Sequence, residues 1–124
     1  MAEPRHDIQQ RTFAFACSVV EFCDAVPDTR PTTRHLLQQL FRAGTSVGAN
    51  LEEAAAGQTK PDFIAKTFVS LKEARETRYW LRLISACRPQ LVSNVAPLTA
   101  ECEQLVAILT AILRSARTTP SRGK

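Results

Sequence analysis

Four stretches of the chain carry apolar residues at steps of three and four. This spacing places the apolar side chains on one face of an α-helix. The pattern predicts helices over residues 5–26, 32–56, 61–88 and 95–117. No segment alternates apolar and polar residues for long enough to indicate a β-strand. The chain is therefore predicted to be all-α.

Helix-breaking residues separate the four stretches. Residues 27–31 read Pro-Asp-Thr-Arg-Pro, Gly57 stands where the second helix is expected to stop, and Pro89 and Pro97 bound the last connection. Long helices joined by short connections favour an antiparallel up-down-up-down four-helix bundle. We expect the bundle to span residues 1–118 and residues 119–124 to form a basic, disordered tail.

The register of the second and third helices can be estimated from the turn between them. If they pack antiparallel around a turn near Gln58, facing residues have numbers that add to about 117. Arg42 then lies level with Glu76, and Glu53 with Lys66. We predict that these are structural ion pairs, or that Arg42 and Glu76 each find a partner in a neighbouring subunit.

The third and fourth helices carry more apolar residues than one bundle core requires. About three positions in seven face inward on a bundle helix. Tyr79, Trp80, Leu83 and Ile108 exceed that number. Large exposed apolar patches are rare on monomers. We therefore expect a homo-oligomer with Tyr79, Trp80 and Leu83 at its interface, the alternative being a monomer with a wide core.

The composition fits one ordinary globular domain: 124 residues, of which 44% are hydrophobic and 23% charged. No apolar run approaches the roughly 18 residues of a membrane span, and residues 1–10 lack the apolar core of a signal peptide. We expect no membrane association and a cytoplasmic location. The cysteines lie in apolar stretches without zinc-ligand spacing, which predicts four buried, reduced thiols.

The net charge of +4 lies entirely in residues 114–124, which hold four basic residues and no acid. The rest of the chain is neutral. Such a basic end either binds phosphate loosely or is a solvated end that aids solubility.

The third helix also carries cations on one face, with Tyr79 and Trp80 among them. Cations interleaved with aromatic rings bind nucleic acid through phosphate contacts and base stacking. The alternative is a solvated or internally paired face, because Glu73 and Glu76 dilute the positive charge. The candidate RNA or DNA contacts, including two from the C-terminal segment, are Lys66, Lys72, Arg75, Arg78, Arg82, Arg114 and Arg117.

One hydrolase-like motif is present, at residues 44–48, which read GTSVG and match GxSxG. That chemistry needs a sharp strand-to-helix turn and a histidine base. Here the motif lies inside a predicted helix, so we interpret its glycines as points of close helix approach. Glu73-x-x-Glu76 lacks the histidine of a di-iron bundle. We therefore predict no catalytic residues, no cofactor and no metal.

Residues 34–84 closely resemble a bacterial four-helix-bundle family, the 23S rRNA intervening-sequence or S23 ribosomal protein family. Its most specific segments are SVGAN at residues 46–50 and KEARETRYWL at residues 72–81. The resembling positions are Leu40, Arg42, Ser46, Val47, Asn50, Glu53, Ala54, Lys60, Phe63, Lys66, Leu71, Glu73, Ala74, Glu76, Thr77, Tyr79, Trp80 and Leu81.

The resemblance implies a left-handed four-helix bundle that assembles into a ring-shaped homopentamer. A related branch is the accessory protein of diversity-generating retroelements, which resembles a basic pentameric barrel that contacts reverse transcriptase and nucleic acid. This chain departs from that branch because its body is neutral. We expect a non-enzymatic scaffold or interaction protein with a protein partner or further copies of itself. The alternative is a nucleic-acid-binding accessory protein that uses the third helix and the C-terminal tail.

Overall fold

The computed structural model describes residues 4–118, and their side chains from residue 7 onward. This part of the chain is helical and contains no strand, so the predicted all-α fold is confirmed. The predicted tail, residues 119–124, lies outside the described residues. The elements are α1 (Pro4–Ala25), α2 (Pro31–Ala55), α3 (Lys60–Cys87), the short 3₁₀ helix η1 (Pro89–Leu91) and α4 (Val92–Thr118).

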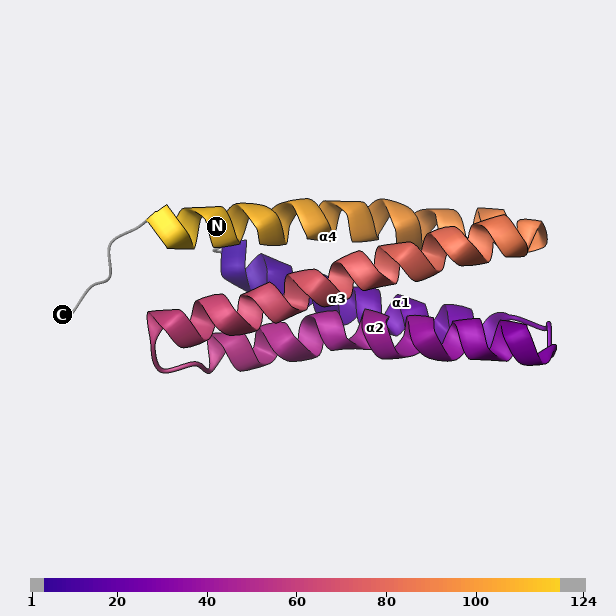
Figure 1. Ribbon diagram of the computed structural model, residues 1–124, viewed down its shortest axis with the longest axis horizontal. Coiled ribbons are helices and arrows are strands. Elements are labelled where there is room, and N and C mark those ends of the chain that lie inside the picture. The colour runs from indigo at the N-terminus through magenta and orange to yellow at the C-terminus, as the bar shows by residue number, and fades with distance from the viewer. Residues whose placement is uncertain (1–3, 119–124) are drawn as a thin grey trace.

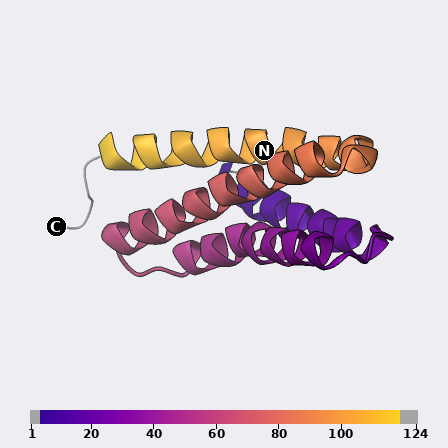
Figure 2. The same cartoon turned by 45° about the vertical axis from the view of Figure 1, so that its right-hand side comes forward.

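The four α-helices lie side by side as a bundle (Figure 1). The α1–α2 and α3–α4 connections are at one end of the bundle, and the α2–α3 connection is at the other end (Figures 1 and 2). Both α1 and α3 pack against α2 and α4, but in the described part of the chain the backbones of α1 and α3 do not come close to each other. They therefore occupy opposite corners of the bundle.

Local signals explain where α2 and α3 begin and end. Pro31 and Pro61 lie in the first turns, where a missing N–H costs nothing. The Thr59 side chain caps α3 by accepting a hydrogen bond from the Asp62 backbone N–H at 3.2 Å. The helix α3 ends at Cys87 before Pro89, which cannot continue it.

The core lies along the bundle axis and receives apolar side chains from every α-helix. These side chains occupy the same helical phases that the apolar pattern predicts. Fully buried examples are Val19 from α1, Leu40 and Val47 from α2, Leu81 and Ile84 from α3, and Leu105 and Leu109 from α4.

The start of α4 differs from the predicted helix of residues 95–117. It begins at Val92, so Pro97 lies inside it instead of in the connection. Pro97 cannot donate to the carbonyl of Ser93, four residues earlier. Ser93 is exposed at the beginning of the helix, where water is available to that carbonyl.

The cysteine prediction is wrong for two of the four thiols. Cys102 is buried and Cys23 half-buried, but Cys17 and Cys87 are exposed. Cys17 lies two residues from both Phe15 and Val19, which are buried, and two residues turn an α-helix by roughly half a revolution. An apolar neighbourhood in sequence therefore does not place a residue in the core.

The segment Pro89–Thr118 is long and apolar enough, by length and composition alone, to cross a membrane. Its mean hydropathy reaches 1.4 even though no uninterrupted apolar run is present. In the bundle, its apolar stripe forms core contacts through Val95, Leu105 and Leu109. The most apolar 18-residue window of this segment is 28% buried inside the bundle.

Candidate functional site

A charged network joins α2 to α3 about midway along their contact. Arg42 Nη2 donates to Glu76 Oε2, and Arg42 Nη1 lies 3.6 Å from Glu73 Oε1. The Trp80 indole Nε1–H donates to the same Glu76 oxygen at 2.9 Å. The structure thus brings Arg42 and Glu76 together, as the register estimate expects.

The second expected pair lies closer to the α2–α3 turn. Lys66 Nζ donates to Glu53 Oε1 at 2.9 Å, and the hydrogen bond raises the pKa of Lys66. Both side chains are largely exposed. This pair fixes the same register as the Arg42 network but is screened by solvent.

The GxSxG residues pack helices and do not form a nucleophile site. A Cβ on Gly44 would lie 3.0 Å from Val19 Cγ2, and one on Gly48 would lie 3.3 Å from the Thr12 carbonyl oxygen. The Ser46 hydroxyl donates to the Arg42 carbonyl of its own helix at 2.6 Å. The two glycines therefore allow α1 to approach α2 closely.

The outer face of α3 carries a line of exposed residues at steps of three and four, which we call the α3 seam. Phe68 is 41% exposed and Tyr79 is 53% exposed, large values for aromatic side chains. The seam cations form no ion pair with any residue the structure describes. The seam consists of Ala65, Phe68, Lys72, Arg75, Tyr79 and Arg82.

The three residues predicted for the oligomer interface differ in their surroundings. Tyr79 projects from the α3 seam, and its ring meets Trp80 edge-on with centroids 5.1 Å apart. Trp80 is half-buried against the core of its own bundle. Leu83 is also half-buried. Of the three side chains, Tyr79 is the most exposed.

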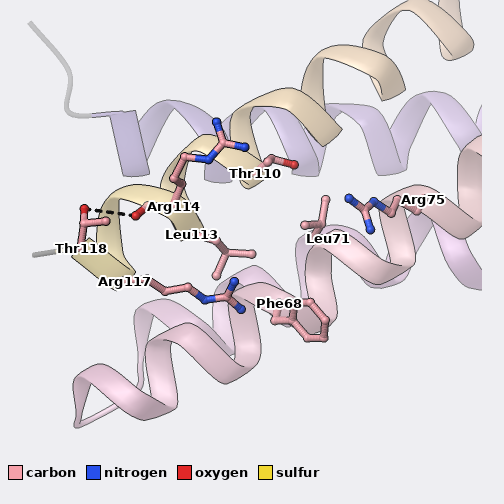
Figure 3. Close-up of a pocket in the computed structure, with 8 residues that line it drawn as sticks. All are labelled: Phe68, Leu71, Arg75, Thr110, Leu113, Arg114, Arg117 and Thr118. Carbon is pink, nitrogen blue, oxygen red and sulfur yellow. Dashed lines mark hydrogen bonds between the residues drawn. The ribbon is translucent and has the colours of Figure 1, made fainter.

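A groove of about 290 Å³ lies between α3 and α4, near the end of α4 (Figure 3). Arg75 comes from α3, Arg114 and Arg117 come from α4, and no acidic side chain of the described residues lines the groove. The Arg117 guanidinium lies 5.9 Å from the centre of the Phe68 ring, within cation–π range. The remaining lining residues are Leu71, Thr110, Leu113 and Thr118. We call this the arginine groove.

The structure divides the predicted nucleic-acid contacts into three groups. Arg75, Arg114 and Arg117 meet at the arginine groove. Lys72 and Arg82 lie on the α3 seam. Lys66 is paired with Glu53, and Arg78 donates to Glu103 at 3.2 Å, so these two are engaged within the bundle. Sequence reasoning missed Phe68 and Thr110, whose place in the groove depends on how α3 and α4 pack.

The most buried thiols are poor nucleophiles. Burial raises the pKa of the Cys102 thiol to about 12 and that of Cys23 to about 11. The Cys102 thiol donates to the Ala74 carbonyl oxygen at 3.3 Å and so joins α4 to α3. Within the described residues, no group of three or more His, Cys, Asp and Glu side chains could hold a metal ion.

Comparison with known families shows to which family the chain belongs. The model of the 23S rRNA-intervening sequence protein family matches residues 5–111. This chain belongs to that family. The resemblance carried by residues 34–84 is therefore confirmed.

A solved structure supports the same assignment. It is a protein of unknown function from the S23 ribosomal protein family of Bacteroides thetaiotaomicron, with a TM-score of 0.81 and 26% sequence identity. The similarity covers 90% of this chain and 99% of the other. No curated protein matches this member of the family. Neither the family description nor the solved structure names a catalysed reaction.

Proposed function

We propose that this family member is a non-enzymatic helical scaffold that assembles from identical copies, with a ring of five as the expected form. The exposed residues of the α3 seam are the main support for this proposal. Two aromatic rings and three cations without ion-pair partners in the described chain lie on one exposed face of a helix whose opposite face forms the core. Aromatic residues and arginine are the types enriched at protein–protein interfaces.

Truncation of Tyr79 tests the proposal. Tyr79→Ala should raise the concentration at which the assembly dissociates by about tenfold or more, because a central aromatic side chain is a typical hot spot. Tyr79 is more informative than Trp80, because Trp80 also packs against its own core. Sedimentation equilibrium over a dilution series measures the change.

Phe41→Ala is the matched control, because Phe41 is an aromatic residue on α2 that is 48% exposed. It should leave the dissociation concentration unchanged. An assembly that is equally stable with and without the Tyr79 ring would contradict the proposal.

The arginine groove favours a second candidate, binding of single-stranded nucleic acid. Among the residues that the structure describes, its three guanidinium groups face no acid within the groove, and Phe68 supplies an aromatic ring. Arginine binds phosphate oxygens, and an exposed aromatic ring stacks on a base. This candidate concerns a surface at the α3–α4 contact that shares Phe68 and Arg75 with the α3 seam, so assembly through the seam competes with it for these two residues.

Fluorescence anisotropy with a labelled single-stranded RNA at about 50 mM salt tests this candidate. Arg114→Gln with Arg117→Gln should weaken binding and reduce the slope of log affinity against log salt by roughly one per lost contact. Arg34→Gln, an exposed arginine on α2, should change neither value. The candidate fails if the unaltered protein does not bind at that salt concentration.

A further inference from the structure

A second exposed face, on α1, has the opposite charge to the α3 seam. Phe13 is 71% exposed, the largest value among the exposed large hydrophobic side chains. The carboxylates of Glu21 and Asp24 form no ion pair with any residue that the structure describes. This α1 face consists of Asp7, Phe13, Cys17, Val20, Glu21 and Asp24, all exposed.

The two faces are complementary but cannot meet within one protomer. One combines apolar side chains with acids, and the other combines aromatic rings with bases. They lie on the outer sides of α1 and α3, which occupy opposite corners of the bundle and whose backbones do not come close to each other in the described part of the chain. The occupant that each face fits is therefore a second copy of this chain.

Contacts inside the bundle fix the relative levels of α1 and α3. Between α1 and α2, Val19 packs on Gly44 and Gln9 donates to Glu52, so facing numbers add to about 62. Between α2 and α3, Lys66 donates to Glu53 and Ser70 donates to the Val47 carbonyl, so they add to about 118. A residue of α1 is thus level with the α3 residue whose number is higher by about 56.

These levels match the chemistry of the two faces. Rotation about an axis parallel to the bundle keeps every residue at its level and keeps α1 and α3 parallel. Asp24 then lies within about two residues of Arg82, and Val20 within about three of Tyr79. Phe13 falls at about residue 69, beside Phe68. Acid therefore meets base, and apolar side chains meet aromatic rings.

We propose that neighbouring copies pack the α3 seam of one protomer against the α1 face of the next. The bundle axes of the two copies are parallel, and the contact is head to tail in the sense that it joins two different faces. The inference rests on the proposed self-assembly and adds which surfaces carry it. Because the contact joins two different faces, its repetition forms a ring when the rotations between successive copies add to a full turn. An ion pair between Asp24 and the neighbour's Arg82 sets the register.

A charge-swap cycle tests the pairing. Asp24→Lys and Arg82→Glu should each raise the dissociation concentration about tenfold or more, because each places like charges together. The dissociation concentration of the chain with both changes should return to within about threefold of that of the unaltered protein, because the ion pair is restored with its signs exchanged. Arg34→Glu changes the net charge as Arg82→Glu does and should leave assembly intact.

The outcomes separate this inference from the proposed function. The pairing is wrong, while self-assembly stands, if the unaltered protein assembles and the two charge changes have no effect. The same conclusion holds if their separate effects on the dissociation concentration multiply in the chain that carries both changes. If the unaltered protein is a monomer, the proposed function fails as well. Circular dichroism melting of each variant shows that the bundle itself remains folded.

A cross-link gives a second, geometric test. Cys17 is level with about residue 73 of α3, close to the exposed Arg75. In a Cys87→Ser chain, Arg75→Cys should form covalent dimers and larger species on oxidation with copper phenanthroline, and Arg34→Cys should not. Cys17→Ser should abolish the cross-link. If it persists without Cys17, α3 meets α3 instead, and the proposed pairing is overturned.

Discussion

Arg42 and Lys66 both bind a glutamate across the α2–α3 contact, but their surroundings differ. Arg42 lies between two carboxylates, and the Glu73 Oε1 atom beside it is buried and has no hydrogen bond to any residue that the structure describes. Lys66 and Glu53 form a single pair in solvent. Arg42 therefore compensates a carboxylate that has one buried oxygen, whereas the Lys66–Glu53 pair mainly competes with water.

Replacement of each cation by methionine distinguishes the two pairs. Arg42→Met should lower the free energy of unfolding by about 1–3 kcal/mol, because it leaves a buried carboxylate oxygen uncompensated. Lys66→Met should lower it by less than about 1 kcal/mol. Urea unfolding at one fixed protein concentration measures both values. Equal losses would show that the Glu73 environment has no special effect.

The four thiols should react in an order set by exposure. Cys87 should be alkylated at once by iodoacetamide at pH 8, and Cys102 only when the protein unfolds, because the thiolate is the reactive form and burial raises the pKa of Cys102 to about 12. By linkage, the fold should lose stability as pH rises above the ordinary thiol value of 9.0. Mass spectrometry of labelled peptides gives the order. Early labelling of Cys102 would contradict it.

At the scale of elements, the α1–α2 contact depends on the missing side chain of Gly44. Alanine favours a helix by about 1 kcal/mol over glycine. A Cβ here would lie 3.0 Å from the Cγ2 of Val19, a stiff and fully buried side chain. The steric cost of overpacking, about 1–3 kcal/mol, should therefore exceed the gain in helix propensity.

Gly44→Ala should thus destabilise the bundle by about 1 kcal/mol in thermal or urea unfolding. The loss should shrink in a Val19→Ala background, because the clashing methyl group is then absent. If Gly44→Ala stabilises the protein in both backgrounds, α1 and α2 are not in contact at this point.

The helices and the α2–α3 register could be predicted from the sequence because both depend on local signals. Apolar spacing fixes the buried face of each helix, and the short turn near Gln58 fixes which residues of α2 and α3 face each other. The start of α4 could not be predicted in the same way. Pro97 usually indicates a boundary, but α4 begins five residues before it.

The candidate sites were only partly predictable. The basic residues of α3 share one helix, so Lys72, Arg75 and Arg82 could be identified from spacing alone. The arginine groove requires Arg75 to meet Arg114 and Arg117, and that depends on how α4 packs after η1. The α1 face could not be predicted from the sequence, because its acids become significant only in comparison with the α3 seam, which lies on another helix.

At the level of the whole molecule, residues 1–113 are neutral in sum, but their acidic and basic side chains are separated in space. Acids gather on the outer face of α1, and cations gather on the outer face of α3 and along the arginine groove. Opposite faces on opposite corners give each protomer two different contact surfaces. Such a protomer favours head-to-tail assembly over a symmetric dimer.

Sedimentation equilibrium of the unaltered, nuclease-treated protein at micromolar concentration measures directly whether the protein assembles. We expect a mass several times the 13.7 kDa of one chain, with five copies as the expected number. A single species of 13.7 kDa across the concentration range would contradict it.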